Sequence, residues 1–420
     1  MSSVSATNIV KQFIHKISGL SPEEHGFSHL DFGATVKRAT YLDTVPPERR
    51  GRWHGRIVPI KDLTDVAGMP STYGSIHRRS HATQSAELVR TLLTEGAIIP
   101  GKTATSELGM TGYTEPVGLP APHNPLWPGE ARTPGGSSGG AAVAVAQGLV
   151  DIAHGSDGGG SIRIPAAACG LVGFKPSHTP IGGMLSAQGV LTRSLAETLF
   201  AHNVERLARP RTLRIGVIIS PLLAHDMSRS DVATEAIRAT ELAANTLAAA
   251  GHDVIDLDPG ALDAAGLFGS FRRVFSAKVS RAEAPSSDIV EWFRDNAHST
   301  PPKKDISRLE GSADELRAAW PVDVLLSPML SHEPPEIGSF TALGPEQDFL
   351  TQTRWTPWGS IFNMSGGAAI SLPLYLSSTE ETPLPVSIQL GAIRVDNRAI
   401  LGLAQQLSAI TWKSGTTARR

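Results

Sequence analysis

Cysteine is nearly absent from this chain, with Cys169 the only one among 420 residues. A single thiol excludes a disulfide framework within the chain and a metal site built from several cysteines. Long apolar runs are also missing, and no stretch approaches the roughly 18 residues that a membrane-spanning helix needs. The first 20 residues lack the apolar region and cleavage site of a secretory signal. These absences predict a cytoplasmic protein without a membrane span.

The chain also lacks an excess of either charge. It has 38 Lys and Arg and 40 Asp and Glu, which gives a formal net charge of −2. This balance gives no electrostatic reason to expect nucleic acid or an anionic membrane as a partner. We expect no metal ion and no cofactor.

What is present is an alternation of strand-like and helix-like segments. Strands are expected at 213–219 (LRIGVII) and 253–257 (DVIDL), on either side of a helix at 231–250 that Ser230 would cap and Gly251 would close. Further strands are expected at 322–328, 368–373 and 386–391, with a closing helix near 396–410. Because no hinge rich in Pro, Gly or Ser interrupts this pattern, it predicts one large α/β domain spanning 1–420.

One motif points to a different function. Residues 96–103, GAIIPGKT, match the phosphate-loop pattern and would indicate a nucleotide-binding ATPase. A working phosphate loop lies between a strand and the helix that follows it. Here the order is reversed, because 85–93 has helical spacing and 97–100 resembles a short buried strand. The context therefore disfavours the ATPase hypothesis.

Two serines lie in glycine-rich turns, Ser137 in GGSSGG and Ser161 in DGGGSIR. The run 158–161 could direct several backbone N–H groups at one point, as a developing oxyanion requires. A serine nucleophile also needs a base, and Lys61, after the apolar run IVPI, is a candidate. None of the 14 histidines lies in a recognisable catalytic pattern.

Together these segments resemble the amidase signature family of serine hydrolases. The resemblance covers most of the chain and rests on VPIKDLTDVAGMPSTYGS, EGAIIPGKTATSELGM, HNP, GGSSGG, GSDGGGSIRIP, CGLVGFKP, FNMSGGAAISLP and LPVSIQLGA, in that order. It implies a central mixed sheet covered by helices. Its signature core would span about 50–200, a substrate-entrance section about 200–320, and a C-terminal sheet and helix about 320–415. GAIIPGKT would then be a structural strand and turn, and Lys102 would bind no phosphate.

The resemblance assigns Ser161 as nucleophile, Ser137 as a bridging serine and Lys61 as the base, with a cis peptide bond between Gly136 and Ser137. The backbone of Gly158, Gly159, Gly160 and Ser161 would form the oxyanion hole. For Lys61 to act near neutral pH, its pKa must fall by about 3 units, which requires burial.

Several neighbours are expected to support this site. Asp157 and Arg163 would hold the nucleophile loop, Ser138 would either bond to Ser137 or form part of the turn, and His154 would be a satisfied, half-buried histidine. The sequence leaves open whether five further residues line the substrate pocket or pack in the core: Tyr113, Arg132, Trp355, Trp358 and Phe362.

The expected function is hydrolysis of a carboxamide C–N bond through a serine acyl-enzyme, giving a carboxylic acid and ammonia or an amine. Esters and carbamates are further candidate substrates, and a homodimer is left open. A glutamine-hydrolysing amidotransferase subunit is the alternative within the family. Gly158 stands where the family commonly has a bulkier residue, and the section from 195 to 320 looks short. The substrate therefore stays open.

Overall fold

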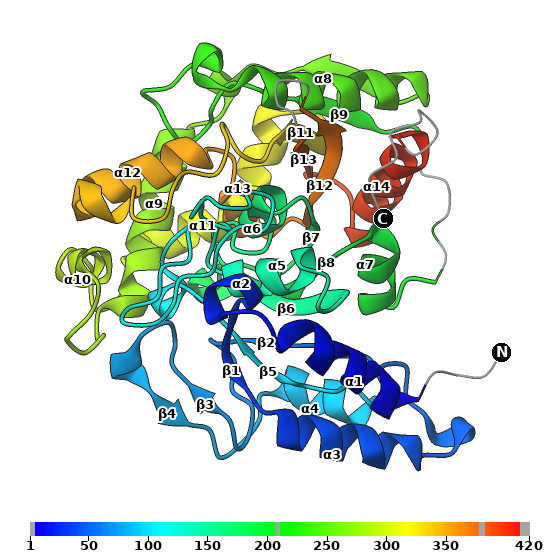
Figure 1. Ribbon diagram of the computed structural model, residues 1–420. Helices are drawn as coiled ribbons and strands as arrows, with labels where there is room; N and C mark the ends of the chain where they lie inside the picture. Colours follow the sequence, from blue (N-terminus) through cyan, green and yellow to red (C-terminus); the bar gives the residue numbers. More distant parts are fainter. Residues whose placement is uncertain (1–4, 206, 208–210, 378–382, 412–420) are drawn as a thin grey trace.

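The computed structural model describes residues 5–205, 207, 211–377 and 383–411, and its centre is one mixed sheet (Figure 1). The sheet runs in the order β10-β9-β11-β13-β12-β7-β8-β6, with parallel pairs at β10–β9–β11 and antiparallel pairs elsewhere. Its strands are β6 Ile152–Asp157, β7 Val172–Lys175, β8 Ala187–Thr192, β9 Arg214–Val217, β10 Asp253–Asp256, β11 Val324–Pro328, β12 Ala369–Leu376 and β13 Pro385–Ala392.

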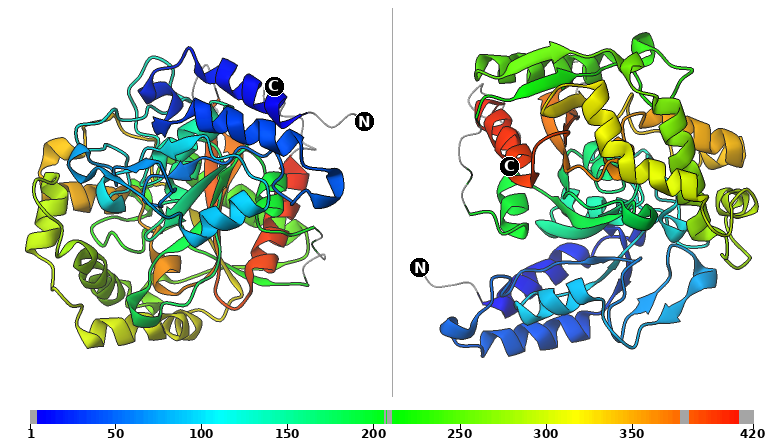
Figure 2. Two further views of the ribbon diagram at one scale, coloured as in Figure 1. Left: turned by 90° about the horizontal axis from the view of Figure 1, so that it is seen from below. Right: turned by 180° about the vertical axis from the view of Figure 1, so that it is seen from behind.

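Helices cover both faces of this sheet (Figure 2). The side chains of β11 point alternately to the two faces and show why both are covered. Val324 and Leu326 pack on one face with α8 (Thr234–Ala249) and α14 (Asn397–Thr411). Leu325, between them, packs on the opposite face with α9 (Ala264–Ser276) and α11 (Lys303–Ala319). Successive side chains of a strand point to opposite faces, so a strand that is apolar throughout is buried on both.

The remaining helices are α1 Ala6–Ile17, α2 Pro22–His25, α3 Phe32–Asp43, α4 Glu87–Thr94, α5 Gly139–Ala146, α6 Arg163–Ala168, α7 Leu195–Ala201, α10 Asp288–Asp295, α12 Pro345–Trp355 and α13 Ile361–Met364. None of the described helices is long and apolar enough to cross a membrane.

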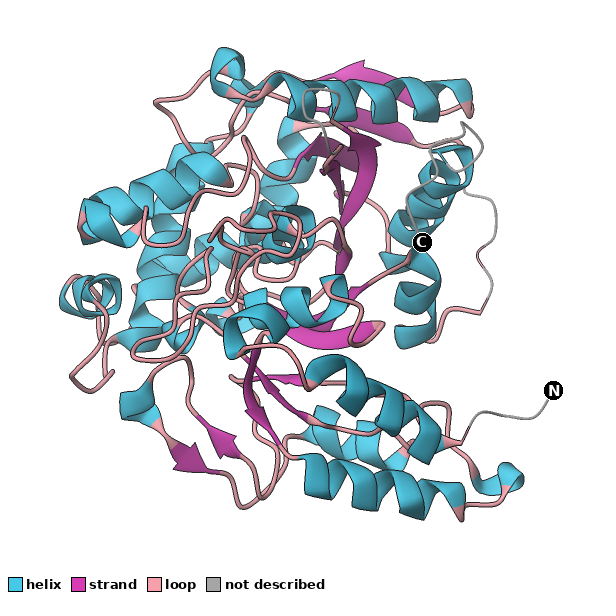
Figure 3. Ribbon diagram, viewed as in Figure 1, coloured by secondary structure: helices cyan, strands magenta, loops and turns pink. Residues whose placement is uncertain are grey.

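The first hundred residues form a layer beside the large sheet, drawn blue in Figure 1. Its three-stranded sheet has the order β1 (Phe27–Leu30), β5 (Gly101–Thr103), β2 (Ile60–Lys61), next to α1, α3 and α4. A hairpin of β3 (Pro70–Ser71) and β4 (Ser80–His81) extends from it (Figure 3). This layer carries Lys61.

The expected α/β fold with a central mixed sheet covered by helices is confirmed, whereas the section boundaries stay predictions. Two local expectations are wrong. Ser230 does not cap α8, which begins at Thr234, because Ser228 and Asp231 form a capping box around a separate short turn. The strand expected at 97–100 begins only at Gly101, and Ile98 makes a single bridge to Ile57.

Candidate active site

Lys61 ends the short strand β2, and its side chain is completely buried. Its Nζ lies 2.7 Å from the Ser137 Oγ and 3.2 Å from the Ser156 carbonyl oxygen. Burial lowers the pKa of Lys61 to about 7, although the charge of Asp157 acts in the opposite direction. The ammonium has no carboxylate in contact within the described part of the chain, so the neutral amine is accessible near pH 7.

Lys102, on the neighbouring strand β5, is equally buried but has an acidic partner. Its Nζ lies 2.8 Å from the Asp62 Oδ1 and 2.9 Å from the Ser71 Oγ. Asp62 is itself fixed by the backbone N–H of Thr72. Lys102 therefore neutralises a buried carboxylate in the small sheet. The last three residues of GAIIPGKT form the strand β5, and the next element is a short 3-10 turn at Glu107–Gly109, not the α-helix that a phosphate loop requires.

Ser137 lies in the turn before α5, after a cis peptide bond between Gly136 and Ser137. The helix that follows begins with glycine because it packs against backbone. A Cβ atom on Gly140 would lie 2.2 Å from the Gly26 carbonyl oxygen and 2.4 Å from the Ala104 nitrogen. This close approach brings Ser137 to the end of β2, and thus to Lys61.

Ser138 joins the two serine turns. Its backbone N–H donates to the Ser161 carbonyl over 3.3 Å, and its hydroxyl lies 3.4 Å from the Ser156 carbonyl oxygen. Among the described residues, the Ser138 hydroxyl has a backbone partner and no hydrogen bond to Ser137, which favours the turn over a bond to Ser137 as its role.

Ser161 follows β6 in a loop that Asp157 and Arg163 fasten. The Arg163 guanidinium donates twice to the Asp157 carboxylate, each time over 2.9 Å, and both side chains are fully buried. Burial alone would raise the pKa of Asp157, but the charge and hydrogen bonds of Arg163 hold that pKa well below its usual range. Arg163 also donates to Asn363 and Gln389, which anchors the loop to α13 and β13.

The oxyanion-hole expectation needs one correction. The Gly160 N–H donates to the Asp157 carboxylate over 2.7 Å and is therefore not free for a substrate. Among the described residues, the N–H groups of Gly158, Gly159 and Ser161 have no protein acceptor. Three donors, not four, can thus turn toward an oxyanion.

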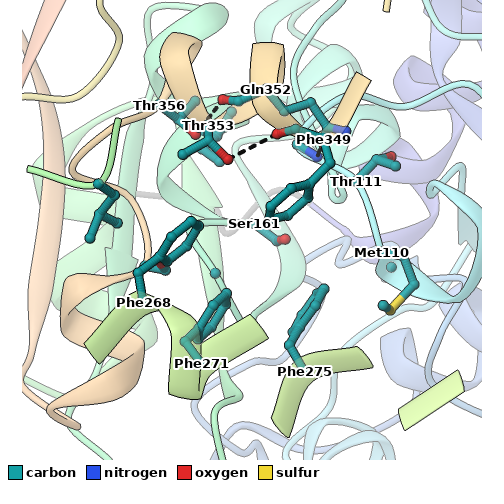
Figure 4. Close-up of a pocket in the computed structure, with 16 residues that line it drawn as sticks. Met110, Thr111, Ser161, Phe268, Phe271, Phe275, Phe349, Gln352, Thr353 and Thr356 are labelled. Atoms are coloured by element: carbon teal, nitrogen blue, oxygen red, sulfur yellow. Dashed lines mark hydrogen bonds between the residues drawn. The ribbon is translucent and has the colours of Figure 1, made fainter. Parts of the chain in front are cut away.

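A narrow pocket with a cavity volume of about 70 Å³ opens beside Ser161 (Figure 4). Phe268, Phe271 and Phe275 enter it from successive turns of α9, and Phe349 enters from α12. Ser161 is 8% exposed, and no protein group described here bonds to its hydroxyl. The other lining residues are Gly109, Met110, Thr111, Gly112, Gly159, Ile164, Leu223, Gln352, Thr353, Thr356 and Ser360.

None of the five residues considered for the pocket lines it. Trp355, Trp358 and Phe362 are fully buried in the core clusters, and Tyr113 stacks on Phe340 while bonding to Asp348. Arg132 lies over the Trp127 ring and pairs with Glu130. The four aromatic residues pack in the core, and a pocket role for any of the five stays untested. The sequence analysis missed the α9 phenylalanines, whose spacing of three and four residues was the available signal.

His154 is fully buried, not half-buried as expected. Its Nδ1 accepts from the Lys61 backbone N–H over 3.3 Å, and its Nε2 lies 2.8 Å from the Gln188 Oε1. These contacts assign the proton to Nε2, and burial lowers the pKa of His154 to about 4. The neutral ring holds the backbone of Lys61 without adding charge. Among the described residues, no three His, Cys, Asp or Glu side chains cluster to hold a metal ion.

Comparison with known proteins identifies the family. A family model described as Amidase matches residues 8–209 and 193–401. AmiB2 of Mycobacterium tuberculosis (strain ATCC 25618 / H37Rv) is 34% identical over 394 residues, covering 84% of this chain and 82% of that protein. The 6-aminohexanoate-cyclic-dimer hydrolase of Paenarthrobacter ureafaciens is 29% identical, covering 97% of this chain and 92% of that protein.

Solved structures show the same fold. A 6-aminohexanoate cyclic dimer hydrolase complexed with its substrate has a TM-score of 0.85 at 25% identity, covering 100% of this chain and 96% of that one. A bacterial aryl acylamidase of the amidase signature family has a TM-score of 0.78 at 22% identity, covering 98% and 94%. The chain belongs to the amidase signature family. It is an amidase, an enzyme that hydrolyses amide C–N bonds, and nothing favours the ATPase or amidotransferase alternatives.

Proposed function

We propose that Ser161, Ser137 and Lys61 form the catalytic relay of this amidase. The observation that carries the proposal is the 2.7 Å contact between the Lys61 Nζ and the Ser137 Oγ. It is made by a buried lysine that has no carboxylate partner in the described part of the chain. A buried ion pair would keep Lys61 protonated, whereas desolvation favours the neutral amine that a general base must be.

The reaction begins when neutral Lys61 takes the Ser137 proton while Ser137 takes the proton of Ser161. The Ser161 oxygen then attacks the amide carbon. The N–H groups of Gly158, Gly159 and Ser161 stabilise the tetrahedral oxyanion. No hydrogen bond joins the two serine hydroxyls among the described residues, so the relay requires them to come into contact when substrate binds, as catalytic hydrogen bonds often tighten in the complex.

Collapse of the intermediate breaks the C–N bond. Ser137 protonates the leaving nitrogen and is reprotonated by Lys61, which leaves an ester on Ser161. Water, deprotonated by the same relay, hydrolyses the ester and returns the carboxylic acid. The amide and one water thus become an acid and an amine or ammonia.

The pocket supports a small or slim acyl group. Four phenylalanines surround a void of about 70 Å³, less than half of the roughly 150 Å³ cavity that holds a benzene ring in another protein. Small amides are therefore the substrates to try first, before aryl amides, esters and carbamates.

Hydrolysis of a small primary amide by single variants, followed as ammonia release, tests the relay. We expect Ser161→Ala and Lys61→Ala to lower kcat/KM at least about 10³-fold, as removal of a nucleophile or its base does. Ser371→Ala is the matched control, because the buried Ser371 hydroxyl on β12 has no hydrogen-bond partner among the residues described by the structure. A kcat/KM within tenfold of the wild-type value in either Ser161→Ala or Lys61→Ala would refute the proposed roles.

A further inference from the structure

A lysine that the relay does not use lies at the edge of the proposed oxyanion hole. Lys278 follows α9 in the short turn Ala277–Val279, and its Nζ lies 3.3 Å from the Ser186 Oγ. A Cβ atom placed on Gly158 would be 3.8 Å from this Nζ and 2.8 Å from the Ser186 Oγ. The ammonium therefore reaches the backbone of the loop that carries Ser161.

Lys278 also contacts the pocket wall. Its Nζ lies 5.3 Å from the centre of the Phe275 ring, and Phe275 lines the pocket beside Ser161. The edge of the same ring would lie 3.9 Å from a Cβ atom on Gly158. Lys278, Phe275 and Gly158 thus lie together. Of these three, Phe275 lines the pocket, so Lys278 and Gly158 lie at its edge.

No acidic side chain neutralises Lys278 within the described part of the chain, and its hydrogen bond goes to a neutral hydroxyl. Although Lys278 as a residue is exposed, desolvation of its ammonium by the surrounding protein lowers its pKa to about 8, which leaves it mainly charged at neutral pH. Lys61 and Lys102 are already occupied by Ser137 and Asp62. Lys278 is the lysine at this site that is available to an anion.

The pocket itself carries no opposing charge. Its polar lining consists of neutral groups such as Thr111, Gln352 and Ser360, with no Asp or Glu. A second cation, Arg272, lies over the Phe349 ring with 4.9 Å to the ring centre, and Glu346 is the acid that acts on it. An anionic group therefore meets attraction at the pocket edge, whereas an ammonium group would find no counter-charge in the lining.

We propose that Lys278 binds a carboxylate carried by the substrate, so that the enzyme prefers amides with an anionic group a few bonds from the scissile carbonyl. This inference rests on Ser161 as the nucleophile beside that pocket. Lys278 is a specificity residue in this account, with no part in the proton relay.

The test compares succinamate with 4-methylpentanamide, its neutral counterpart of the same shape. We expect wild-type kcat/KM to favour succinamate about tenfold or more, the contribution of a partly exposed hydrogen bond to a charged group. Lys278→Met should reduce this ratio to near one, and Lys278→Arg should keep most of it. Lys11→Met, an exposed lysine on α1, is the matched control and should leave the ratio unchanged.

Equal losses on both amides in Lys278→Met would overturn the inference, because they would mean a structural or general electrostatic role. Binding of the two amides to Ser161→Ala, with and without Lys278→Met, gives a readout without turnover. If succinamate binds more tightly than the neutral amide, and this difference disappears in Lys278→Met, the carboxylate site is supported. This holds even if wild type hydrolyses neither amide, because the lack of hydrolysis would count only against the relay. Equal affinity for both amides would contradict the carboxylate site.

Discussion

Lys61 and Lys102 are buried on adjacent strands of the small sheet, yet among the residues that the structure describes only Lys102 has a carboxylate in contact. Desolvation disfavours the charged form of any lysine, and an ion pair compensates for it. Lys61 contacts a hydroxyl and a carbonyl oxygen, which are both uncharged, so its neutral form can be populated near pH 7. The difference between the two lysines follows from their partners.

This difference predicts the pH dependence of acylation. Since the relay needs neutral Lys61, kcat/KM should rise with pH, pass an inflection near pH 7 and level off above it. Each unit below the inflection should cost about tenfold in rate. Initial rates on a substrate that does not titrate, measured from pH 5 to 9, would show this profile.

Lys175 provides the control for that profile, because burial lowers its pKa to about 7 as well. Its ammonium donates to the Pro176 carbonyl and contacts His178, and it has no contact with either serine hydroxyl. Lys175→Gln should therefore keep the inflection. A profile that loses its inflection in this variant, or one with an inflection near pH 10 in wild type, would contradict the role of Lys61.

At the scale of elements, the loop between β6 and α6 sets the geometry of Ser161, the proposed nucleophile. Gly160 has φ +120°, which favours glycine, and a Cβ atom there would lie 2.8 Å from Ile164. The neighbouring Gly159 has room, since its Cβ would meet only Phe271, at 3.4 Å. Alanine substitutions at Gly159 and Gly160 therefore form a matched pair, since the two positions are adjacent and only Gly160 has the positive φ.

We expect Gly160→Ala to lower the free energy of unfolding by about 1–3 kcal/mol more than Gly159→Ala, because only Gly160 has a conformation that alanine adopts with strain. Thermal or urea unfolding of both variants beside wild type measures this difference. Equal unfolding midpoints for the two variants would show that the loop does not need the φ angle described here.

The elements also show what sequence reasoning can reach. The strands β11, β12 and β13 were predictable because each has Val, Ile or Leu at closely spaced positions over the length of a strand. α5 was not, since all the residues from Gly139 to Val145 are buried and a helix buried on every side has no periodic pattern. The α9 phenylalanines had the right spacing, but spacing does not tell whether an apolar stripe faces the core or a pocket.

On the scale of the whole molecule, the candidate site joins three distant parts of the chain. Lys61 comes from the small sheet, Ser137 from the start of α5, and Ser161 from the end of a strand in the large sheet. The two sheets meet where the His154 N–H donates to the Pro59 carbonyl and the His154 ring accepts from the Lys61 N–H. Local sequence patterns could propose these residues only through the family resemblance, because their proximity depends on how the two sheets pack.

The packing of distant segments also explains why the substrate preference could not be predicted from the sequence. The pocket is closed by α9 and α12, which lie far along the chain from Ser161, and Lys278 approaches Gly158 only through this packing. The aromatic residues for which a pocket role was left open against core packing lie buried in the core clusters. The chemistry of the relay and the preference for a substrate therefore depend on different elements.

Labelling with a fluorophosphonate serine probe, followed by peptide mapping, tests the relay most directly when wild type and Lys61→Ala are compared. The account predicts a label on Ser161 in wild type that forms at least about 10³-fold more slowly without Lys61. A label on a different residue, or labelling of Ser161 at an unchanged rate in Lys61→Ala, would contradict it.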